Sequence, residues 1–206
     1  RDLRMSRGLG DVYKRQFMYK EGMEMDAFAH DTDGSVYENA VWPGTSVFPD
    51  FTKQSVRSWW GDKTKILLEH GISGIWNDMN EPAIFYSEKH LKEVFDKIDD
   101  YKGKNLDIQS FFEFKGMVEG VANNLGDYER FYHRATQPDG EAVVRHDHVH
   151  NLYGFNMTRA ASESFKELAP DKDILMFSRA SYIGMHRYGG IWTGDNHAWW
   201  SPVSYT

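Results

Sequence analysis

Three charged residues each follow a short apolar run, and their side chains are of the types that perform acid–base and nucleophilic chemistry. The runs are residues 72–76 before Asp78, 174–177 before Arg179 and 190–192 before Asp195. A short, mainly apolar run of this length is typical of a buried parallel strand. Because the carboxyl ends of parallel strands meet at one edge of a sheet, we expect the three side chains to lie close together.

Two carboxylates beside aromatic residues favour one kind of chemistry. Asp78 closely follows Trp76, and Asp195 closely follows Trp192. Glycoside hydrolysis needs such a pair, in which one carboxylate acts as nucleophile or base and the other as proton donor. A single Asp after a strand is more often a helix N-cap, so the prediction rests on the three strand ends taken together.

The spacing of apolar residues indicates strands that alternate with helices. Helices are expected over residues 52–70, beginning at an N-cap Thr52, and over 87–101, within 108–131 and over 151–168, with a turn at 137–140 and a long structured loop over 17–51. Such alternation predicts an α/β fold in which right-handed crossovers join parallel strands. The chain has 206 residues. It is therefore shorter than a complete (β/α)₈ barrel, which typically needs about 250 residues.

The composition excludes several classes of function. The formal net charge of −7 argues against a protein that binds nucleic acid or anionic membranes, since both need a basic face. The chain has no cysteine, which excludes a disulfide framework, thiolate metal ligation and a cysteine nucleophile. No apolar run reaches the length of a membrane span. The lack of cysteine and of a visible export signal favours a cytoplasmic location.

Four blocks of sequence carry a resemblance to a known family. Residues 71–82 contain the run WNDMNEP, and the other blocks are 41–44 with 48–51, 150–154 with Met157, and 179–182 with 190–196. The first of these blocks closely resembles the nucleophile signature of glycoside hydrolase family 31, the α-glucosidase and α-xylosidase family. The blocks lie in the order of that family and cover nearly everything from Phe17 to Trp200.

The resemblance implies a role for each matching residue. Asp78 would be the nucleophile that forms a covalent glycosyl-enzyme, and Asp195 would be the general acid and then the general base. Arg179 would bond sugar hydroxyls and help to keep Asp78 ionised. Glu81 would support the site through hydrogen bonds. The walls of the first sugar subsite would come from Trp42, Trp76, Met79 and Trp192. The mechanism requires no metal and no organic cofactor.

The resemblance covers only part of the family's catalytic barrel. It implies an α/β fold, a partial (β/α)₈ TIM barrel with about strands four to six and their helices. We expect the catalytic domain over residues 17–201, with a long insertion at 83–145 between the fourth strand and its helix. Residues 1–16 and 202–206 resemble translated sequencing-adapter read-through and are predicted to be non-native. An open barrel exposes strand edges and apolar surface, so we expect the isolated chain to be inactive.

The function implied is that of a retaining hydrolase that releases α-linked glucose from oligosaccharides by double displacement. The alternatives are an α-xylosidase of the same family, a transglycosylase that uses the same intermediate, and a non-catalytic carbohydrate-binding remnant. The presence of both Asp78 and Asp195 argues against the last. The expected partner is an α-glucoside oligosaccharide, with no nucleic acid and no membrane, and the full-length protein is free to form an oligomer.

A cluster of histidines suggests a different chemistry. His146, His148 and His150 alternate along the chain, with Asp147 among them. In an extended strand the three imidazoles would point the same way and would suit zinc or nickel. The family resemblance instead places His150 at a junction between a loop and a helix, which makes metal binding the less favoured interpretation.

Overall fold

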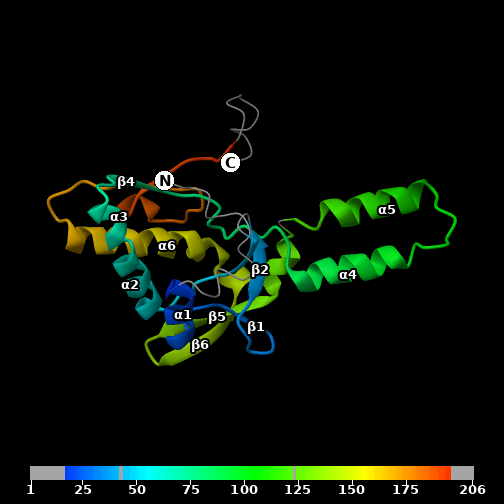
Figure 1. Cartoon of the computed structure of the whole chain (residues 1–206), viewed down its shortest axis with the longest axis horizontal. Helices are drawn as coiled ribbons and strands as arrows, with labels where there is room; N and C mark the ends of the chain where they lie inside the picture. The colour runs from blue at the N-terminus through cyan, green and yellow to red at the C-terminus, as the bar shows by residue number, and fades with distance from the viewer. Residues whose placement is uncertain (1–16, 42–43, 123, 196–206) are drawn as a thin grey trace. The chain divides into compact units, whose positions relative to one another are not determined.

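The computed structural model describes residues 17–41, 44–122 and 124–195, and the chain divides into two compact units. The first unit combines the residues up to Asp50 with Ala83–His148. The second combines Phe51–Pro82 with the residues from Val149 onward. Each unit is therefore built from stretches that are far apart in the sequence (Figure 1).

The second unit contains a three-stranded parallel sheet in the order β4-β7-β8. Its strands are β4 (Gly74–Asn77), β7 (Leu175–Ser178) and β8 (Gly190–Ile191). Gly74 pairs with Leu175, and Phe177 pairs with Gly190. The expectation of an α/β fold with parallel strands near 72–76, 174–177 and 190–192 is confirmed, and the described strands do not close a barrel.

One face of this sheet is covered by the helix α6 (His146–Leu168). Ala161 and Phe165 of α6 pack against Met176 of β7, and Ile75 of β4 adds to the same cluster. Successive strand residues point to opposite faces of a sheet. The neighbours of these core residues are accordingly exposed, namely Trp76, Leu175 and Phe177. The core of this unit is therefore one-sided.

The prediction of one continuous helix over 52–70 is wrong, because the segment forms two helices. The structure has two helices, α2 (Gln54–Lys63) and α3 (Lys65–Glu69), and the N-cap of α2 is Lys53 rather than Thr52. The break falls at Thr64, whose backbone N–H and hydroxyl both donate to the carbonyl of Gly61. Threonine hydroxyls that bond back to an earlier turn compete with the helix and bend it.

The first unit contains elements where the sequence predicts a loop over 17–51. They are α1 (Phe17–Glu24), β1 (His30–Asp31), β2 (Glu38–Val41) and β3 (Gly44–Val47). The strands have only two to four residues, which is too short for an alternating pattern to stand out. β2 and β3 form an antiparallel pair, while β1 pairs with β5, a strand from the segment after residue 83.

The predicted turn at 137–140 is confirmed as the end of a β-hairpin. Its strands are β5 (Phe131–Gln137) and β6 (Gly140–Arg145), and Gln137 pairs with Gly140. The hairpin extends the antiparallel sheet to the order β1-β5-β6. The two strands themselves are absent from the sequence prediction, because their residues mix charged, polar and apolar side chains without strict alternation.

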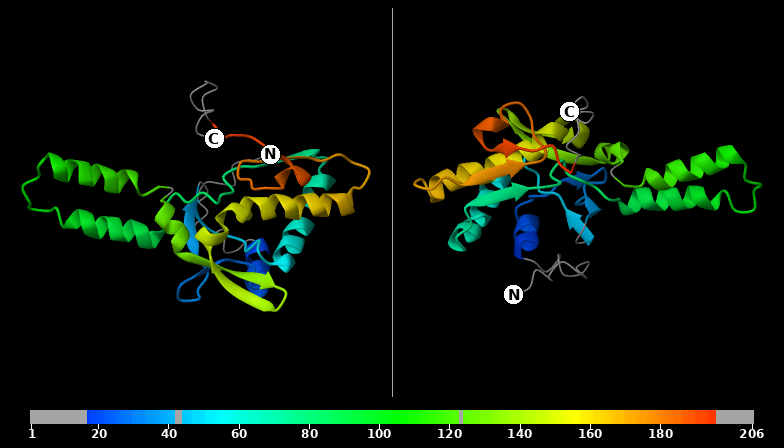
Figure 2. Two further views of the ribbon diagram at one scale, coloured as in Figure 1. Left: turned by 180° about the vertical axis from the view of Figure 1, so that it is seen from behind. Right: turned by 90° about the horizontal axis from the view of Figure 1, so that it is seen from above.

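Two helices of the first unit lie side by side in both Figure 1 and Figure 2, namely α4 (Glu88–Asp99) and α5 (Ile108–Glu119). The hydroxyl of Ser87 caps α4 and the carboxylate of Asp107 caps α5. A 3₁₀ helix, η2 (Leu125–Glu129), follows, and another, η3 (Met185–Arg187), precedes β8 in the second unit. The helices predicted over 87–101 and within 108–131 are thus confirmed. None of the helices in the described part of the chain is long and apolar enough to cross a membrane.

The premise for a histidine metal site is wrong, because α6 begins at His146, five residues earlier than predicted. His146 is buried, whereas the side chain of His148 is 66% exposed. A helix turns these side chains in different directions, where a strand would align them. Residues 17–41, 44–122 and 124–195 contain no group of three or more His, Cys, Asp or Glu side chains that could hold a metal ion.

A chain of buried polar side chains in the first unit links β5 and α6 to Asp50. Nδ1 of His133 donates to Oδ1 of Asp50 at 2.9 Å, and Nε2 of His133 lies 2.9 Å from Nδ1 of His146. The other carboxylate oxygen of Asp50 accepts from the backbone N–H of Arg134 at 2.7 Å. Phe131 stacks on His146 with 4.3 Å between ring centroids. Each oxygen of the buried Asp50 carboxylate therefore accepts a hydrogen bond from the protein.

We expect His133→Ala to destabilise the full-length protein that carries this chain by about 2–4 kcal/mol. The substitution leaves a cavity and removes the side-chain donor to a buried carboxylate. The matched control is His148→Ala, at an exposed histidine, which should change stability by less than about 0.5 kcal/mol. The urea midpoints of the two variants test this difference, and equal midpoints would contradict the role given to the network.

Candidate active site

The carboxyl ends of β4 and β7 meet at one edge of the parallel sheet and hold two of the predicted site residues in contact. The backbone N–H of Arg179 donates to the carbonyl of Asn77 at 3.1 Å. Nη1 of Arg179 lies 3.1 Å from Oδ1 of Asp78. The pairing of the two strands therefore brings together side chains that are about one hundred residues apart in the sequence.

Arg179 is held mainly by a third residue, Glu81. Nε of Arg179 donates to Oε1 of Glu81 at 2.7 Å, and Nη2 donates to Oε2 at 3.0 Å. This two-point contact raises the pKa of Arg179 above its usual value, and the charges of Glu81, Asp78 and Asp195 add to the rise. The supporting role predicted for Glu81 thus corresponds to a direct contact, and the guanidinium stays positively charged beside Asp78.

Asp195 lies in the loop after β8 and is exposed, as is Asp78. Its charge reaches Arg179, since it contributes to the raised pKa of that guanidinium. Asp78 and Arg179 are therefore in contact, and Asp195 lies in the loop that follows the neighbouring strand β8 of the same unit.

The side chain of Asn80 joins the two loops that carry Asp78 and Arg179. Its Nδ2 donates to the hydroxyl of Ser178 at 2.9 Å, and its Oδ1 accepts from the backbone N–H of Ala180 at 3.1 Å. The Ser178 hydroxyl in turn donates to the carbonyl of Ala180 at 2.7 Å. Asn80 and Ser178 are almost completely buried, so these bonds are shielded from water. Sequence reasoning missed Asn80, although it stands in the polar run after the first strand.

A left-handed backbone turn directs Asp78 outward. Met79 has a φ of 57°, an uncommon conformation for a residue with a side chain. Its backbone N–H donates to Oδ1 of Asp78 at 2.8 Å. The same carboxylate oxygen therefore accepts from this N–H and lies against the guanidinium of Arg179.

Two of the predicted wall residues form an aromatic pair. Trp76 is 66% exposed and meets Trp192 edge to face, with 5.3 Å between ring centroids and 68° between ring planes. Met79 is half-buried beside them in the sequence. Trp42, the fourth predicted wall residue, lies outside the described residues.

The helix α6 closely approaches the two loops that carry Asp78 and Arg179, and the point of approach is Gly154. A Cβ atom added to Gly154 would lie 2.6 Å from the Cβ of Ala180 and 2.7 Å from the carbonyl oxygen of Asn80. In the same unit, Asn77 donates from its Nδ2 to the hydroxyl of Thr158 at 3.2 Å. His150 also belongs to this helix, and burial lowers its pKa against the opposing charge of Glu81. One helix thus supports both loops.

Comparison with known proteins places this site in a family. The model of the glycosyl hydrolases family 31 TIM-barrel domain matches residues 7–206. The chain is similar to alpha-glucosidase 2 of Bacillus thermoamyloliquefaciens, with 34% identity over 186 residues that cover 90% of this chain and 19% of that protein. It is also similar to an alpha-glucosidase of Saccharolobus solfataricus, with 32% identity over 179 residues, 87% of this chain and 23% of that protein.

A solved structure gives a similar result. The GH31 dextranase of Flavobacterium johnsoniae, complexed with glucose, superimposes with a TM-score of 0.59 at 26% identity. The match covers 87% of this chain and 17% of that protein. The chain therefore spans about a fifth of the length of the proteins it resembles.

We expect Gly154→Ala to destabilise the full-length protein by about 1–3 kcal/mol, because the added methyl group forces α6 away from Asn80 and Ala180. The matched control is Gly116→Ala in α5, where an added Cβ meets nothing within 4 Å. That change should stabilise the protein by up to about 1 kcal/mol, since alanine favours helix more than glycine does. Thermal unfolding measures both, and shifts of the same sign would contradict the close approach.

Proposed function

Because the chain belongs to glycosyl hydrolase family 31, we propose that it carries the catalytic centre of a retaining α-glucosidase. The proposed substrate is an α-glucoside oligosaccharide from which glucose is released. The observation that carries the proposal is the contact of Arg179 with Asp78, at the sheet edge where Asp195 also lies. The names of the two curated relatives support a glucosidase rather than an α-xylosidase.

In the proposed first step, a carboxylate oxygen of Asp78 attacks the anomeric carbon. The glycosidic C–O bond breaks, and the proton of the Asp195 carboxyl moves to the leaving oxygen. The product is a glucosyl ester of Asp78 and an alcohol. The Met79 N–H and Arg179 both contact Oδ1 of Asp78 and hold this carboxylate in position for the attack.

In the proposed second step, Asp195 acts in its ionised form. Its carboxylate takes a proton from water while the water oxygen attacks the anomeric carbon and the ester bond to Asp78 breaks. Retention of the α configuration follows from the two successive displacements. A transglycosylase would use a sugar hydroxyl in place of water, so the ratio of the two products distinguishes these functions.

Exposed aromatic faces support the proposal for a sugar substrate. Trp76 and Trp192 stand next to Asp78 and Asp195 in the sequence and pair with one another. Aromatic rings of this kind offer apolar faces to the CH groups of a pyranose. Trp42 and Met79 complete the proposed first subsite. A carbohydrate-binding remnant without catalysis would share these rings but would not need both Asp78 and Asp195.

We further propose that β4, β7 and β8 correspond to strands four to six of the family barrel, with residues 83–145 as an insertion between the fourth strand and its helix. The exposed apolar face of the sheet and its open edges support the view that the isolated chain is inactive. The kinetic experiments therefore belong on the full-length protein. A cytoplasmic location stays a prediction from composition.

We expect Asp78→Ala to abolish turnover of every α-glucoside by the full-length enzyme, because no other carboxylate takes its place at the anomeric carbon. Asp195→Ala should lower kcat/KM for maltose about 10²–10⁴-fold, the range supplied by general acid catalysis. The same variant should lose far less with an aryl glucoside, whose leaving group needs no protonation. Steady-state kinetics with both substrates measures the split.

Equal losses of Asp195→Ala on maltose and on the aryl glucoside would contradict the acid–base role. Asp173→Ala serves as the control, because Asp173 lies in the loop before β7, outside the cluster around Arg179. It should keep the activity of the parent enzyme on both substrates. Activity should also survive a metal chelator.

A further inference from the structure

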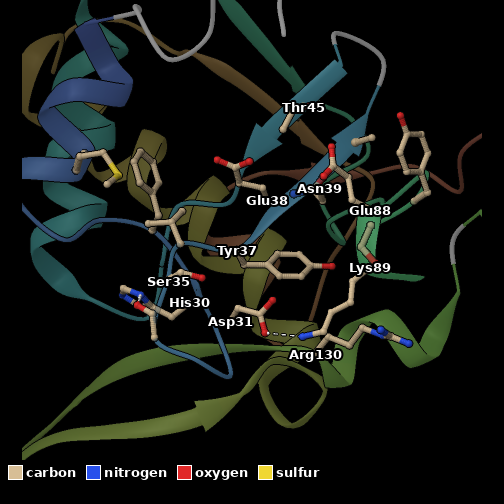
Figure 3. A pocket seen from close by; sticks show the side chains of 18 of the residues that line it. His30, Asp31, Ser35, Tyr37, Glu38, Asn39, Thr45, Glu88, Lys89 and Arg130 are labelled. Atoms are coloured by element: carbon tan, nitrogen blue, oxygen red, sulfur yellow. Dashed lines mark hydrogen bonds and ion pairs between the residues drawn. The ribbon is translucent and has the colours of Figure 1, made fainter. Parts of the chain in front are cut away.

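A cavity of about 760 Å³ lies within the first unit. Its wall includes residues of α1, β1, β2 and β3, the start of α4, and Arg130, as Figure 3 shows for most of the lining side chains. Cavities that bind small molecules have volumes of about 300–1,000 Å³. The cavity shares no residue with the cluster of Asp78, Arg179 and Asp195.

Two buried polar atoms in this wall have hydrogen-bonding capacity to spare. The phenol oxygen of Tyr37 and Oδ1 of Asn39 make no hydrogen bond with the described residues, although each residue is only 2% exposed. Burial and the charge of Asp127 raise the pKa of the Tyr37 phenol. The Ser87 hydroxyl lies near enough to oppose part of this rise. Figure 3 shows the Tyr37 ring extending toward Lys89. Buried polar atoms of folded proteins are normally satisfied, so these two call for a ligand or ordered water.

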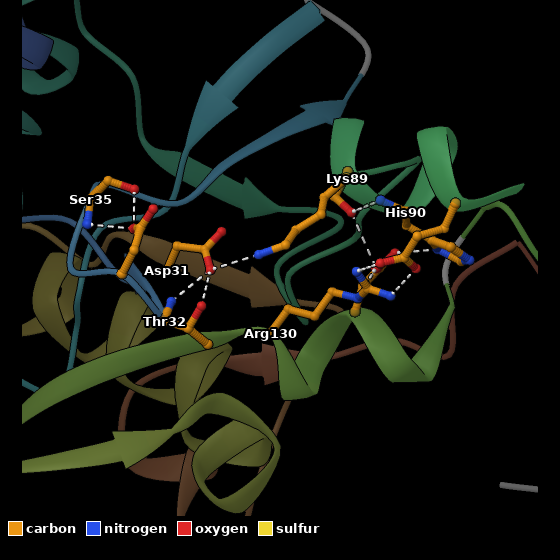
Figure 4. Close-up of polar contacts among 10 residues, drawn as sticks. Asp31, Thr32, Ser35, Lys89, His90 and Arg130 are labelled. Atoms are coloured by element: carbon orange, nitrogen blue, oxygen red, sulfur yellow. Dashed lines mark hydrogen bonds and ion pairs between the residues drawn. The ribbon is translucent and has the colours of Figure 1, made fainter. Parts of the chain in front are cut away.

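Asp31 and Arg130, two charged residues of the cavity wall, are held in place by contacts with neighbouring side chains. Asp31 accepts two hydrogen bonds from Thr32, at 2.6 and 2.9 Å, and lies 3.4 Å from Nζ of Lys89 (Figure 4). Arg130 donates to both carboxylate oxygens of Glu93, at 2.9 and 2.6 Å. Lys89 has only the one long contact with Asp31 among those described, so its ammonium retains N–H groups for a ligand.

The charges of the side chains that line the cavity indicate which kind of ligand it would bind. Four carboxylates line the cavity, those of Asp26, Asp31, Glu38 and Glu88, against the cations of Lys89 and Arg130. An anion such as a phosphate or a uronic acid would meet a net negative wall. A metal ion is disfavoured as well, because the described residues contain no group of three or more metal-ligating side chains. A neutral ligand with many hydroxyls fits best, since it can donate to carboxylates and accept from an ammonium.

Ring surfaces complete the match to a sugar. Tyr86 is 37% exposed and lines the cavity, and the exposed thioether of Met23 adds a second apolar surface beside it. A pyranose presents CH groups on its faces and hydroxyls at its rim, which suits apolar rings beside polar side chains. We propose that this cavity is a second, non-catalytic binding site for a neutral saccharide of two or three units, built around Tyr37, Tyr86 and Lys89.

The experiment titrates the full-length protein calorimetrically with the thio-linked analogues of maltotriose and isomaltotriose, which resist hydrolysis. We expect two equivalents of at least one analogue per protein chain. Lys89→Met should weaken binding of one equivalent at least tenfold, because Lys89 is an exposed donor whose loss leaves the fold intact. Tyr37→Phe should do the same by removing only the phenol oxygen.

The matched control is Lys92→Met, on the same helix α4 but outside the cavity wall. This variant should still bind two equivalents of the analogue per protein chain. All three variants should hydrolyse an aryl α-glucoside at the rate of the parent enzyme. One equivalent in the parent that is unaffected by Lys89→Met, or two equivalents that persist in both cavity variants, would overturn the proposal.

The inference does not depend on the proposed hydrolysis, and the experiment separates the two. If the protein fails to hydrolyse any α-glucoside but one equivalent of analogue still binds and is lost in Lys89→Met, the cavity proposal stands alone. If hydrolysis is present and no equivalent responds to the cavity variants, only the catalytic proposal stands.

Discussion

The parallel pairing of β4 with β7 is the constraint on which the site depends. Asn77 pairs with Ser178, so the residues that follow, Asp78 and Arg179, leave the sheet at the same level. A shift of one residue in this register would turn every side chain of the strand to the other face. It would also separate the guanidinium from the carboxylate that it contacts at 3.1 Å. The chemistry of the edge is therefore set by backbone hydrogen bonds.

Placing several carboxylates around one guanidinium is favourable only because other contacts fix their geometry. Glu81 accepts hydrogen bonds from two of the Arg179 nitrogens. Asn80 joins the loop that carries Asp78 to the loop that carries Arg179. Asp78 is left with one contact to Arg179 and stays exposed. These contacts leave the exposed carboxylate available to a substrate, while Glu81 holds the guanidinium beside it at two points.

The sequence predicts the strands that end in Asp78, Arg179 and Asp195, because short apolar runs and their polar ends are local signals. It does not predict the Asn80 bridge or the left-handed turn at Met79, since both depend on the distance between two loops that meet only in the fold. The buried pair of His133 with Asp50 joins residues far apart in the chain, and no local pattern marks it. Catalytic roles for the predicted residues stay predictions, whereas membership of the family and the α/β fold are confirmed.

The bare face of the parallel sheet has a consequence for how the protein is made. On this face Trp76, Leu175 and Phe177 are exposed in this chain, which spans about a fifth of the length of its curated relatives. During synthesis on the ribosome, these side chains emerge before any later part of a longer polypeptide can cover them. Exposed apolar surface and open strand edges invite aggregation. Chaperone protection of the nascent chain should therefore matter most before the later strands of the sheet have been synthesised.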